Sequence, residues 1–499
     1  MKKYVLNPNI SGTGYDYQFI VENKTVWRPW HDGSRFVIPE DCTTISSVII
    51  PTKETQVIRY FLDLFVTHAH PLLIVGPTGT GKSAVSVNHL LGLDEKKYAS
   101  NIINFSAQTT SQLTQEMICS KLDKRRKGYI GPAVGKQMIV FVDDLNMPMK
   151  QTYGAQPPIE LLRQQQDQGH WYNPQGSSKL YLEDIILLCA MGPPGGSRND
   201  ITSRCTRHFN VVSVDSFGEA IFSIIFGTIV DWHFAKGFAS NCVVTGQMTV
   251  AATAQLFHGI LPKFLPIPSK SHYLFNLRDF ARVIGGILLL PATQCSGPPV
   301  IIRLWLHEVY RVFYDRLTDG DDRKTFFGMC RDVISSVFKN DINTLLAHCC
   351  EPGSSTVQDD DVRKLLFGNY SNPSGNRVYS EIQDLDTLQG TVEGYLEEYN
   401  QMSKTPMTFV PFRYAIEHVS KVSRVLLQPN GHVLLAGIGG SGRSSVAKLA
   451  THVGDYQLFQ IEISKNYTAA DWRGDLRSLL FKAGAAGEPT TFLFNDNQV

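Results

Sequence analysis

The sequence predicts an α/β fold: a parallel β-sheet flanked by helices, then a helical subdomain and a second, shorter α/β unit. Apolar runs of strand length alternate with longer helical patterns between residues 41 and 214. A phosphate-binding motif directly follows the first of these runs. A related motif and similar apolar runs recur after residue 430, which indicates an internal repeat of the first unit.

The apolar runs of the first unit define the expected sheet. They are nearly continuous in Val, Ile, Leu and Phe, without the polar alternation of a half-exposed strand. This pattern is typical of parallel strands covered by helices on both faces. We therefore expect five strands, at 71–75, 101–105, 138–142, 185–191 and 209–214.

The regions around this unit have different patterns. Residues 15–30 contain two short aromatic and β-branched runs around a polar turn, which predicts a hairpin. Between 215 and 345 the pattern is helical, and in 272–290 one face carries Leu274, Leu277, Phe280, Ile284 and Ile287. Residues 349–378 are rich in Gly, Pro, Ser and Asp, which predicts a linker. Strands are expected again at 432–437, 457–463 and 490–496.

The composition argues against several classes of protein. A net charge of +1 gives no field for gathering nucleic acid or a membrane surface. The basic run 124–127 is interpreted as a solvated helix end. The most apolar stretch, 283–292, is far shorter than the roughly 20 residues of a membrane helix, so we expect a core helix that ends at Pro291. The nine cysteines show no metal-binding spacing, which favours reduced thiols in a cytosolic protein.

The stretch "GPTGTGKS" carries the strongest chemical signal, because it matches GxxxxGK[ST] between an apolar strand and a helical pattern. In such a loop the backbone amides surround phosphates, the lysine neutralises phosphate oxygens and the serine ligates Mg²⁺. We therefore expect ATP or ADP with Mg²⁺ to bind at Gly76, Pro77, Thr78, Gly79, Thr80, Gly81, Lys82 and Ser83.

The strand "MIVFVDD" supplies the acidic half of the site. Asp143 is placed to hold Mg²⁺ through water. Asp144 occupies the position of the base that orients the attacking water, where glutamate is usual. Because aspartate is one methylene shorter, we expect tight binding and slow hydrolysis.

Three further arginines are candidates for contact with phosphate. Arg204 and Arg207 precede the fifth strand, from which an arginine could reach the γ-phosphate of a neighbouring module. Taken alone, either is more often a surface ion-pair partner. Arg278, in the helical subdomain, could reach back to the phosphates as a lid sensor.

The second loop, "GIGGSGRSS", has arginine where lysine is expected. Arg443 keeps the positive charge in a planar guanidinium, and Ser444 can still meet Mg²⁺. After the later strand, Asp496 fits the Mg²⁺-associated acid, but Asn497 cannot accept a proton as a carboxylate does. We expect this second site, with Gly437, Gly442, Arg443 and Ser444, to bind nucleotide more readily than it hydrolyses it.

These residues resemble the AAA+ motor region of dynein heavy chains of the axonemal type. The matching stretches cover most of residues 40–499 and include "GPTGTGKS", "INFSAQTT", "VFVDDLNMP", "YGAQPPIELLRQ", "AMGPPGG", "YNQMSKTP", "GIGGSGR" and "LFQIEISKNY". The resemblance implies a P-loop AAA+ sheet with strand order 5-1-4-3-2 and a helical lid. It implies the third of six ring modules, followed by the start of the fourth.

The resemblance also implies the domain organisation and the partners. Other AAA+ modules of the ring are the expected partners, and microtubules are reached only through parts absent from this chain. It implies a place in the cytoplasm and cytoskeleton, in the axoneme of a cilium or flagellum, with neither nucleic acid nor a membrane as partner. The expected domains are the tail of a preceding module (1–40), the large α/β subdomain (41–214), the lid (215–348), a linker (349–378) and a next module shortened after its third strand (379–499).

Individual roles follow from the same resemblance. It favours Arg207 as the finger that serves the preceding module and Arg278 as the lid sensor. Ile50 and Pro51 would lie over the adenine. The sequence departs from the family at Gly192, where related modules often keep a polar sensor at the end of the fourth strand.

Three functional hypotheses remain open at this point. The chain could be part of a mechanoenzyme whose ATP cycle gates a microtubule motor. It could instead be a structural element stiffened by nucleotide without turnover, or belong to another AAA+ remodelling machine. The family's first module, stroke linker and stalk have no counterpart here, so the chain resembles a fragment whose shortened second unit we expect to be marginally stable.

Overall fold

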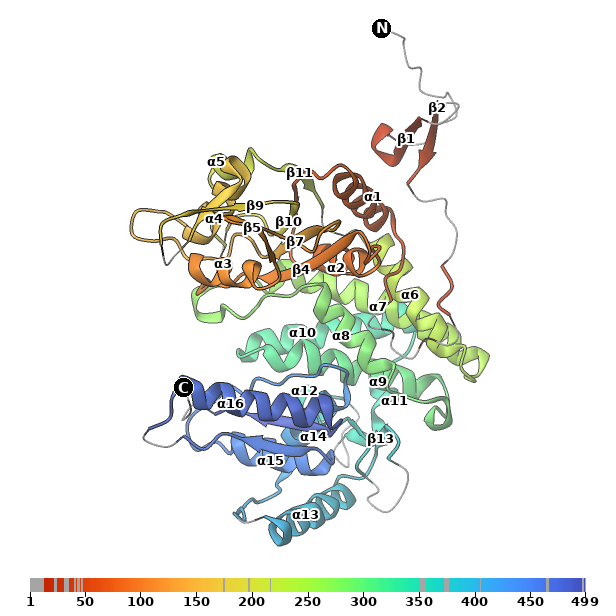
Figure 1. The fold of residues 1–499 in the computed structure, drawn as a ribbon. Helices are drawn as coiled ribbons and strands as arrows, with labels where there is room; N and C mark the ends of the chain where they lie inside the picture. The colour runs from red at the N-terminus through yellow and green to blue at the C-terminus, as the bar shows by residue number, and fades with distance from the viewer. Residues whose placement is uncertain are drawn as a thin grey trace. The chain divides into compact units, whose positions relative to one another are not determined.

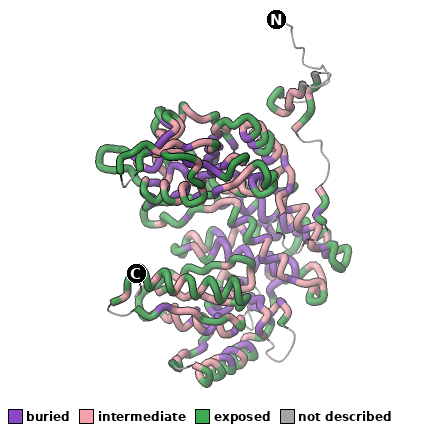
Figure 2. Tube along the Cα trace, in the orientation of Figure 1, coloured by how far each residue is buried: buried purple, intermediate pink, exposed green. Residues whose placement is uncertain are grey.

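The computed structural model of this chain describes residues 13–21, 25–30, 36–39, 42, 45, 48–173, 176–195, 198–215, 217–350, 356–371, 377–403, 405–463, 466–495 and 498 (Figure 1). The chain divides into two compact units, Met1–Thr228 and Ile229–Val499. Buried residues are concentrated in the middle of each unit (Figure 2). Among the described residues, no helix has both the length and the apolar character needed to cross a membrane.

A five-stranded parallel sheet forms the centre of the first unit. Its order is β11-β3-β10-β7-β4, which in chain order of these strands is 5-1-4-3-2. All pairings between neighbours are parallel. The five predicted strands are therefore confirmed, with the bounds β3 Leu72–Val75, β4 Tyr98–Asn104, β7 Gln137–Asp143, β10 Ile185–Met191 and β11 Asn210–Ser213.

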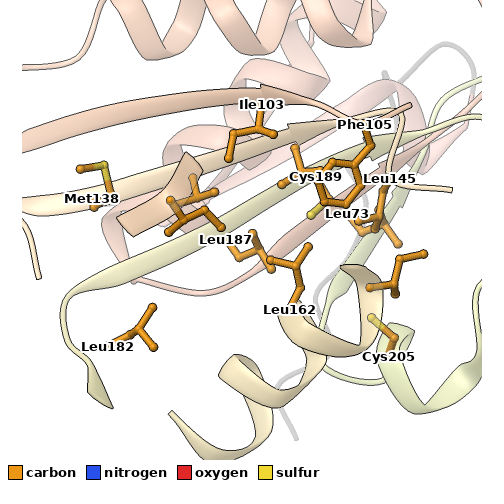
Figure 3. Packing of buried hydrophobic residues seen from close by; sticks show 14 of the residues in the cluster. Leu73, Ile103, Phe105, Met138, Leu145, Leu162, Leu182, Leu187, Cys189 and Cys205 are labelled. Carbon is orange, nitrogen blue, oxygen red and sulfur yellow. The ribbon is translucent and has the colours of Figure 1, made fainter. Parts of the chain in front are cut away.

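Helices cover both faces of this sheet, because successive strand residues point to opposite sides. In β7, Val140 belongs to one core cluster and Phe141 to the other. The first cluster packs against α3, α4 and α5 (Figure 3) and the second against α1 and α2. The bounds are α1 Lys53–Thr67, α2 Lys82–Leu91, α3 Ser111–Cys119, α4 Pro157–Gln168 and α5 Ser203–Thr206.

Two smaller sheets accompany the main one. The predicted hairpin is confirmed as β1 Tyr17–Val21 paired antiparallel with β2 Thr25–Pro29. A four-stranded sheet contains β5 Asp123–Arg126, β6 Tyr129–Gly131, β8 His170–Tyr172 and β9 Lys179–Leu182. The basic run at 124–127 therefore starts in a strand, and its interpretation as a helix end is wrong. Its side chains have local partners: Arg126 stacks on Tyr129 and pairs with Glu183.

Helices dominate the chain from α6 Glu219–Phe234 to residue 345, as predicted. Phe280, Ile284 and Ile287 of α8 are buried. The helix starts at Leu277 because Asn276 caps it, its side chain accepting a hydrogen bond from the Arg278 amide. Leu274 precedes the cap and is 61% exposed, so its predicted place on the buried face is wrong. The other helices are α7 Ser240–Lys263, α8 Leu277–Ile287, α9 Pro298–Val312, α10 Gly320–Val333 and α11 Ile342–Leu345.

The predicted linker is packed in its described part. Residues 356–371 contain α12 Asp359–Val362 and β12 Leu366–Gly368, which pairs with β13 Ser380–Ile382. Phe367 is fully buried. Glycine, proline and serine content indicated an open segment, but the short apolar run at 365–367 anchors this stretch in the core.

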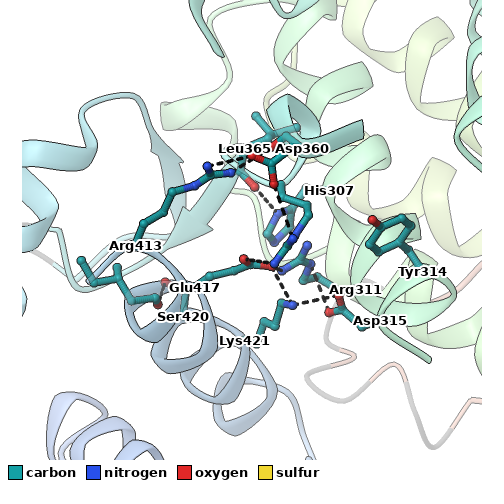
Figure 4. A network of polar contacts seen from close by, with 12 residues as sticks. His307, Arg311, Tyr314, Asp315, Asp360, Leu365, Arg413, Glu417, Ser420 and Lys421 are labelled. Atoms are coloured by element: carbon teal, nitrogen blue, oxygen red, sulfur yellow. Dashed lines mark hydrogen bonds and ion pairs between the residues drawn. The ribbon is translucent and has the colours of Figure 1, made fainter. Parts of the chain in front are cut away.

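A network of charges ties α9 to α14 Arg413–Leu427 within the second unit (Figure 4). Glu417 of α14 contacts Lys421 at 2.7 Å, Arg363 at 2.8 Å and Arg311 of α9 at 3.8 Å. Lys421 also contacts Asp315, at 2.9 Å. Burial alone would raise the pKa of Glu417, but the charges of Lys421 and Arg311 outweigh it and lower the pKa to about 2. The carboxylate is thus held ionised between the two helices.

The α/β region after residue 430 forms only part of the predicted sheet. β14 Gln457–Gln460 and β15 Thr490–Leu493 pair in parallel, close to two of the expected positions. Residues 432–437 form no strand, so that prediction is wrong, and Leu434 is 93% exposed. A cavity of about 740 Å³ is lined by 432–435 and by 490–495. In the first unit, β10 fills the corresponding place between β3 and β7. The remaining helices are α13 Leu385–Met402, α15 Arg443–Val453 and α16 Ala469–Leu480.

This difference predicts unequal amide protection in the two repeats. β3 is paired on both edges, whereas 432–437 has no strand partner among the described residues. We expect the amides of 72–75 to exchange at least about a hundredfold more slowly than those of 433–437, because core amides exchange only on large-scale opening. Native-state hydrogen exchange with mass spectrometry measures this. Equal protection of the two stretches would contradict the account.

Candidate nucleotide site

The loop between β3 and α2 has the backbone of a phosphate cradle. Gly79 has φ 90° and Gly81 has φ 71°, which side-chain-bearing residues rarely adopt. Lys82, the first residue of α2, is 8% exposed. Its Nζ donates hydrogen bonds to the carbonyl oxygens of Gly76 at 2.7 Å and Pro77 at 2.6 Å. The lysine is thus folded back over the loop, with its ammonium at the centre of the cradle.

Gly76 is needed where the loop leaves the sheet. Its amide donates to the Met191 carbonyl, which continues the pairing of β3 with β10. A Cβ at this position would lie 2.3 Å from the Val214 carbonyl oxygen. The first glycine of the motif therefore allows the close approach of the chain after β11.

The acids lie at the same edge of the sheet, because the carboxyl ends of parallel strands meet there. β7 ends at Asp143, whose Oδ1 accepts a hydrogen bond from the Asp144 amide at 3.0 Å. Asp144 has φ 52°, a left-handed conformation that aspartate and asparagine adopt more readily than other side chains. The aspartate at the base position thus matches the local backbone.

Arg198 joins the two halves of the site, and the sequence analysis missed it. Its Nη1 donates to Thr78 Oγ1 at 2.9 Å, and its Nη2 contacts Asp144 Oδ1 at 3.3 Å. One guanidinium therefore touches both the phosphate loop and the acid after β7. The available signal was position, since Arg198 follows the fourth strand, whose carboxyl end emerges at the same sheet edge.

These residues fit a magnesium nucleotide. The loop amides, Lys82 and the N-terminus of α2 suit phosphate oxygens. Ser83 and Asp143 offer oxygen ligands, and Mg²⁺ usually keeps several waters, so few protein ligands are needed. The described part of the chain contains no cluster of three or more His, Cys, Asp or Glu side chains able to hold a metal.

The remaining predicted residues lie on other segments of the chain. Ile50 is buried and Pro51 is half-buried, just before α1. Arg207 precedes the amino end of β11, at the sheet edge opposite the loop, and its Nη2 contacts Asp167 at 3.3 Å. Arg278 is exposed in the first turn of α8, in the second unit.

The second loop repeats the cradle's backbone in altered surroundings. Gly440 has φ 80° and Gly442 has φ 78°, close to the angles of the first loop. Arg443 starts α15, and its side chain passes over Gly437, where a Cβ would lie 3.5 Å from its Cδ. Ser444 Oγ donates to Asn495 Oδ1 at 3.4 Å. The predicted Asp496 and Asn497 lie outside the described residues.

A glycine-rich phosphate loop on a 5-1-4-3-2 parallel sheet, followed along the chain by a helical region, defines the P-loop AAA+ class of ATPases. Comparison with known families agrees at three places in the chain. Residues 36–217 match the P-loop containing dynein motor region, 249–348 match the AAA+ lid domain, and 407–499 match the P-loop containing dynein motor region D4. The chain belongs to the dynein motor region family.

Curated relatives agree over nearly the whole chain. Dynein axonemal heavy chain 3 of Homo sapiens is 50% identical over 494 residues, which is 98% of this chain and 12% of the relative. Dynein axonemal heavy chain 12 of Homo sapiens is 44% identical over 475 residues, 94% of this chain and 15% of the relative. Dynein axonemal heavy chain 1 of Rattus norvegicus is 41% identical over 488 residues, 95% of this chain and 10% of the relative. The chain thus spans about an eighth of the first of these relatives.

Proposed function

We propose that this chain is part of the motor ring of an axonemal dynein heavy chain and that its first unit binds ATP or ADP with Mg²⁺. The observation that carries the proposal is the convergence of Lys82, Thr78 and Asp144 at one sheet edge, where Arg198 links Thr78 to Asp144. In the proposal, this unit is the third of six ring modules and contributes to ATP-driven movement along microtubules in a cilium or flagellum.

The proposed domain boundaries follow the sequence analysis: the tail of a preceding module to residue 40, the large subdomain 41–214, the lid 215–348, a connecting segment 349–378 and the next module from 379. The other modules of the ring are the proposed partners. Arg207 faces away from its own loop, as a finger serving the preceding module would. Arg278 is proposed as the lid sensor, and Ile50 and Pro51 as contacts to adenine.

Within the site, we assign Ser83 and Asp143 to Mg²⁺ and Asp144 to the orientation of the attacking water. The short aspartate side chain also pairs with Arg198, which draws it toward Thr78. The shorter acid and its pairing with Arg198 support the proposal that the site binds tightly and hydrolyses slowly. The alternative is a catalytically silent module that nucleotide stiffens without turnover.

The second loop is proposed to bind nucleotide only weakly in this chain. Gly437, Gly442, Arg443 and Ser444 keep the cradle. The stretch before them has no partner strand among the described residues, so the loop is not anchored as the first loop is. A loop free to change shape must be ordered when phosphate binds, and that ordering reduces affinity.

The two loop cations provide a matched test of nucleotide binding. Lys82→Ala removes the ammonium at the centre of the first cradle, and we expect ATP and ADP affinities to fall by at least about a hundredfold, as for loss of a buried charge-assisted contact. Arg443→Ala removes the corresponding cation of the second loop. We expect the affinity of the tight site for ATP and ADP to stay within about threefold of that of the unaltered chain. Isothermal titration calorimetry with Mg²⁺ present measures both. Equal losses in the two variants would contradict the assignment of the site.

The role of Asp144 is tested by Asp144→Asn, which retains the left-handed backbone and removes the carboxylate. We expect nucleotide affinity to stay within about threefold, while single-turnover hydrolysis of labelled ATP slows by at least about tenfold because the acid that orients the water is lost.

In the same assay, slow product formation by the unaltered chain supports an active site. Binding without any product supports the silent module instead. Hydrolysis at an unchanged rate in Asp144→Asn would show that another group orients the water.

A further inference from the structure

We propose that Arg198 is the residue through which this site distinguishes ATP from ADP, by contacting the γ-phosphate. This inference deepens the proposed function and rests on it. The guanidinium bridges Thr78 of the phosphate loop and Asp144, at 2.9 Å and 3.3 Å. Both partners belong to the half of the site where the last phosphate and the attacking water meet.

The position of the two partners favours the γ-phosphate over the β-phosphate. The loop amides and the N-terminus of α2 would hold phosphates common to both nucleotides, and Lys82 would reach the β- and γ-phosphates. Thr78 lies earlier in the loop, and Asp144 follows the Mg²⁺-side acid at the end of β7. A phosphate bound between them would be the γ-phosphate, which ATP has and ADP lacks. A guanidinium at this point presents several planar N–H donors to phosphate oxygens.

Electrostatics also require a cation there. The charge of Asp143 would be offset by Mg²⁺, but Asp144 would still put a carboxylate next to a phosphate that carries negative charge of its own. Asp144 and the γ-phosphate would repel each other in the partly buried site. Arg198, with a side chain only 21% exposed, offsets that repulsion while it holds the carboxylate. The γ-phosphate thereby gains a favourable contact and loses an unfavourable one.

The backbone of Arg198 is fixed by its neighbours. Its amide and carbonyl exchange hydrogen bonds with those of Gly195, at 3.2 Å each. The next residue, Asn199, donates its amide to the Asn146 carbonyl at 3.1 Å and its side chain to the Pro148 carbonyl at 2.9 Å. The backbone at Arg198 is therefore held against the segment that follows β7, so only its side chain must be ordered when phosphate binds.

Gly192 provides the space for this arrangement. A Cβ on Gly192 would lie 1.9 Å from Arg198 Nη1 and 2.5 Å from its Cζ. The guanidinium thus fills the volume that any side chain at the end of β10 would occupy. The carbonyl of Gly192 is held by the buried Asn146 side chain, whose Nδ2 donates at 2.9 Å.

The test compares the affinity of the full chain for two ligands, a non-hydrolysable ATP analogue and ADP, each with Mg²⁺, by isothermal titration calorimetry. Arg198→Ala is expected to weaken the ATP analogue by at least about tenfold, the loss of a charge-assisted hydrogen bond, and to leave ADP within about twofold. Arg198→Lys keeps a positive charge without the planar guanidinium, and should restore part of the lost affinity for the ATP analogue. Gly192→Ala displaces the guanidinium and should reproduce the Arg198→Ala pattern.

Two controls separate the possible failures. Arg59→Ala removes an exposed arginine of α1 that bonds Asn88, and should change neither affinity. Lys82→Ala should weaken both nucleotides together. An equal loss of the ATP analogue and ADP in Arg198→Ala would assign the arginine a structural role and overturn the inference. If Arg198→Ala leaves both affinities unchanged while Lys82→Ala weakens nucleotide binding, the inference about Arg198 is overturned and the proposed function stands. An unaltered chain that binds neither nucleotide would overturn the proposed function and the inference with it.

Discussion

The parallel pairing of β3 between β10 and β11 is the constraint on which the nucleotide site depends. It brings three segments that are distant in sequence to one edge of the sheet: the phosphate loop after β3, the Arg198 segment after β10 and the acids after β7. The contacts of Arg198 with Thr78 and Asp144 follow from this arrangement. Gly76 continues the pairing with β10 and permits the close approach of Val214, so the loop starts from a fixed point.

The second repeat shows which features of the phosphate loop form without the strand pairing seen in the first repeat. Its glycines adopt nearly the same φ values as those of the first loop, so the turn itself is encoded locally. The preceding apolar run remains without a strand partner among the described residues, and a cavity lies between it and β15. A phosphate loop can therefore form its turn although the stretch before it is not paired in a sheet. In the first unit, the described residues also place an acid and a second cation opposite the loop.

Much of this was predictable from local sequence, because apolar runs and a glycine motif are short-range signals. The strand positions, the hairpin and the roles expected of Lys82 and Asp143 depended on such signals. The start of α8 was missed because Asn276 caps the helix and leaves Leu274 outside it. Arg198 was missed because its importance lies in two contacts, 120 and 54 residues away in the chain. Composition likewise failed at 356–371, where a few buried apolar residues outweigh many polar ones.

The central claim is that the described residues form one complete nucleotide site, at the carboxyl edge of the five-stranded sheet. The most direct measurement is the number of ATP molecules bound per chain at saturation, by equilibrium dialysis with labelled ATP and Mg²⁺. The account predicts a single tight site, with any second binding weaker by at least about a hundredfold, because the second loop must be ordered on binding. Two sites of equal affinity, or no binding at all, would contradict it.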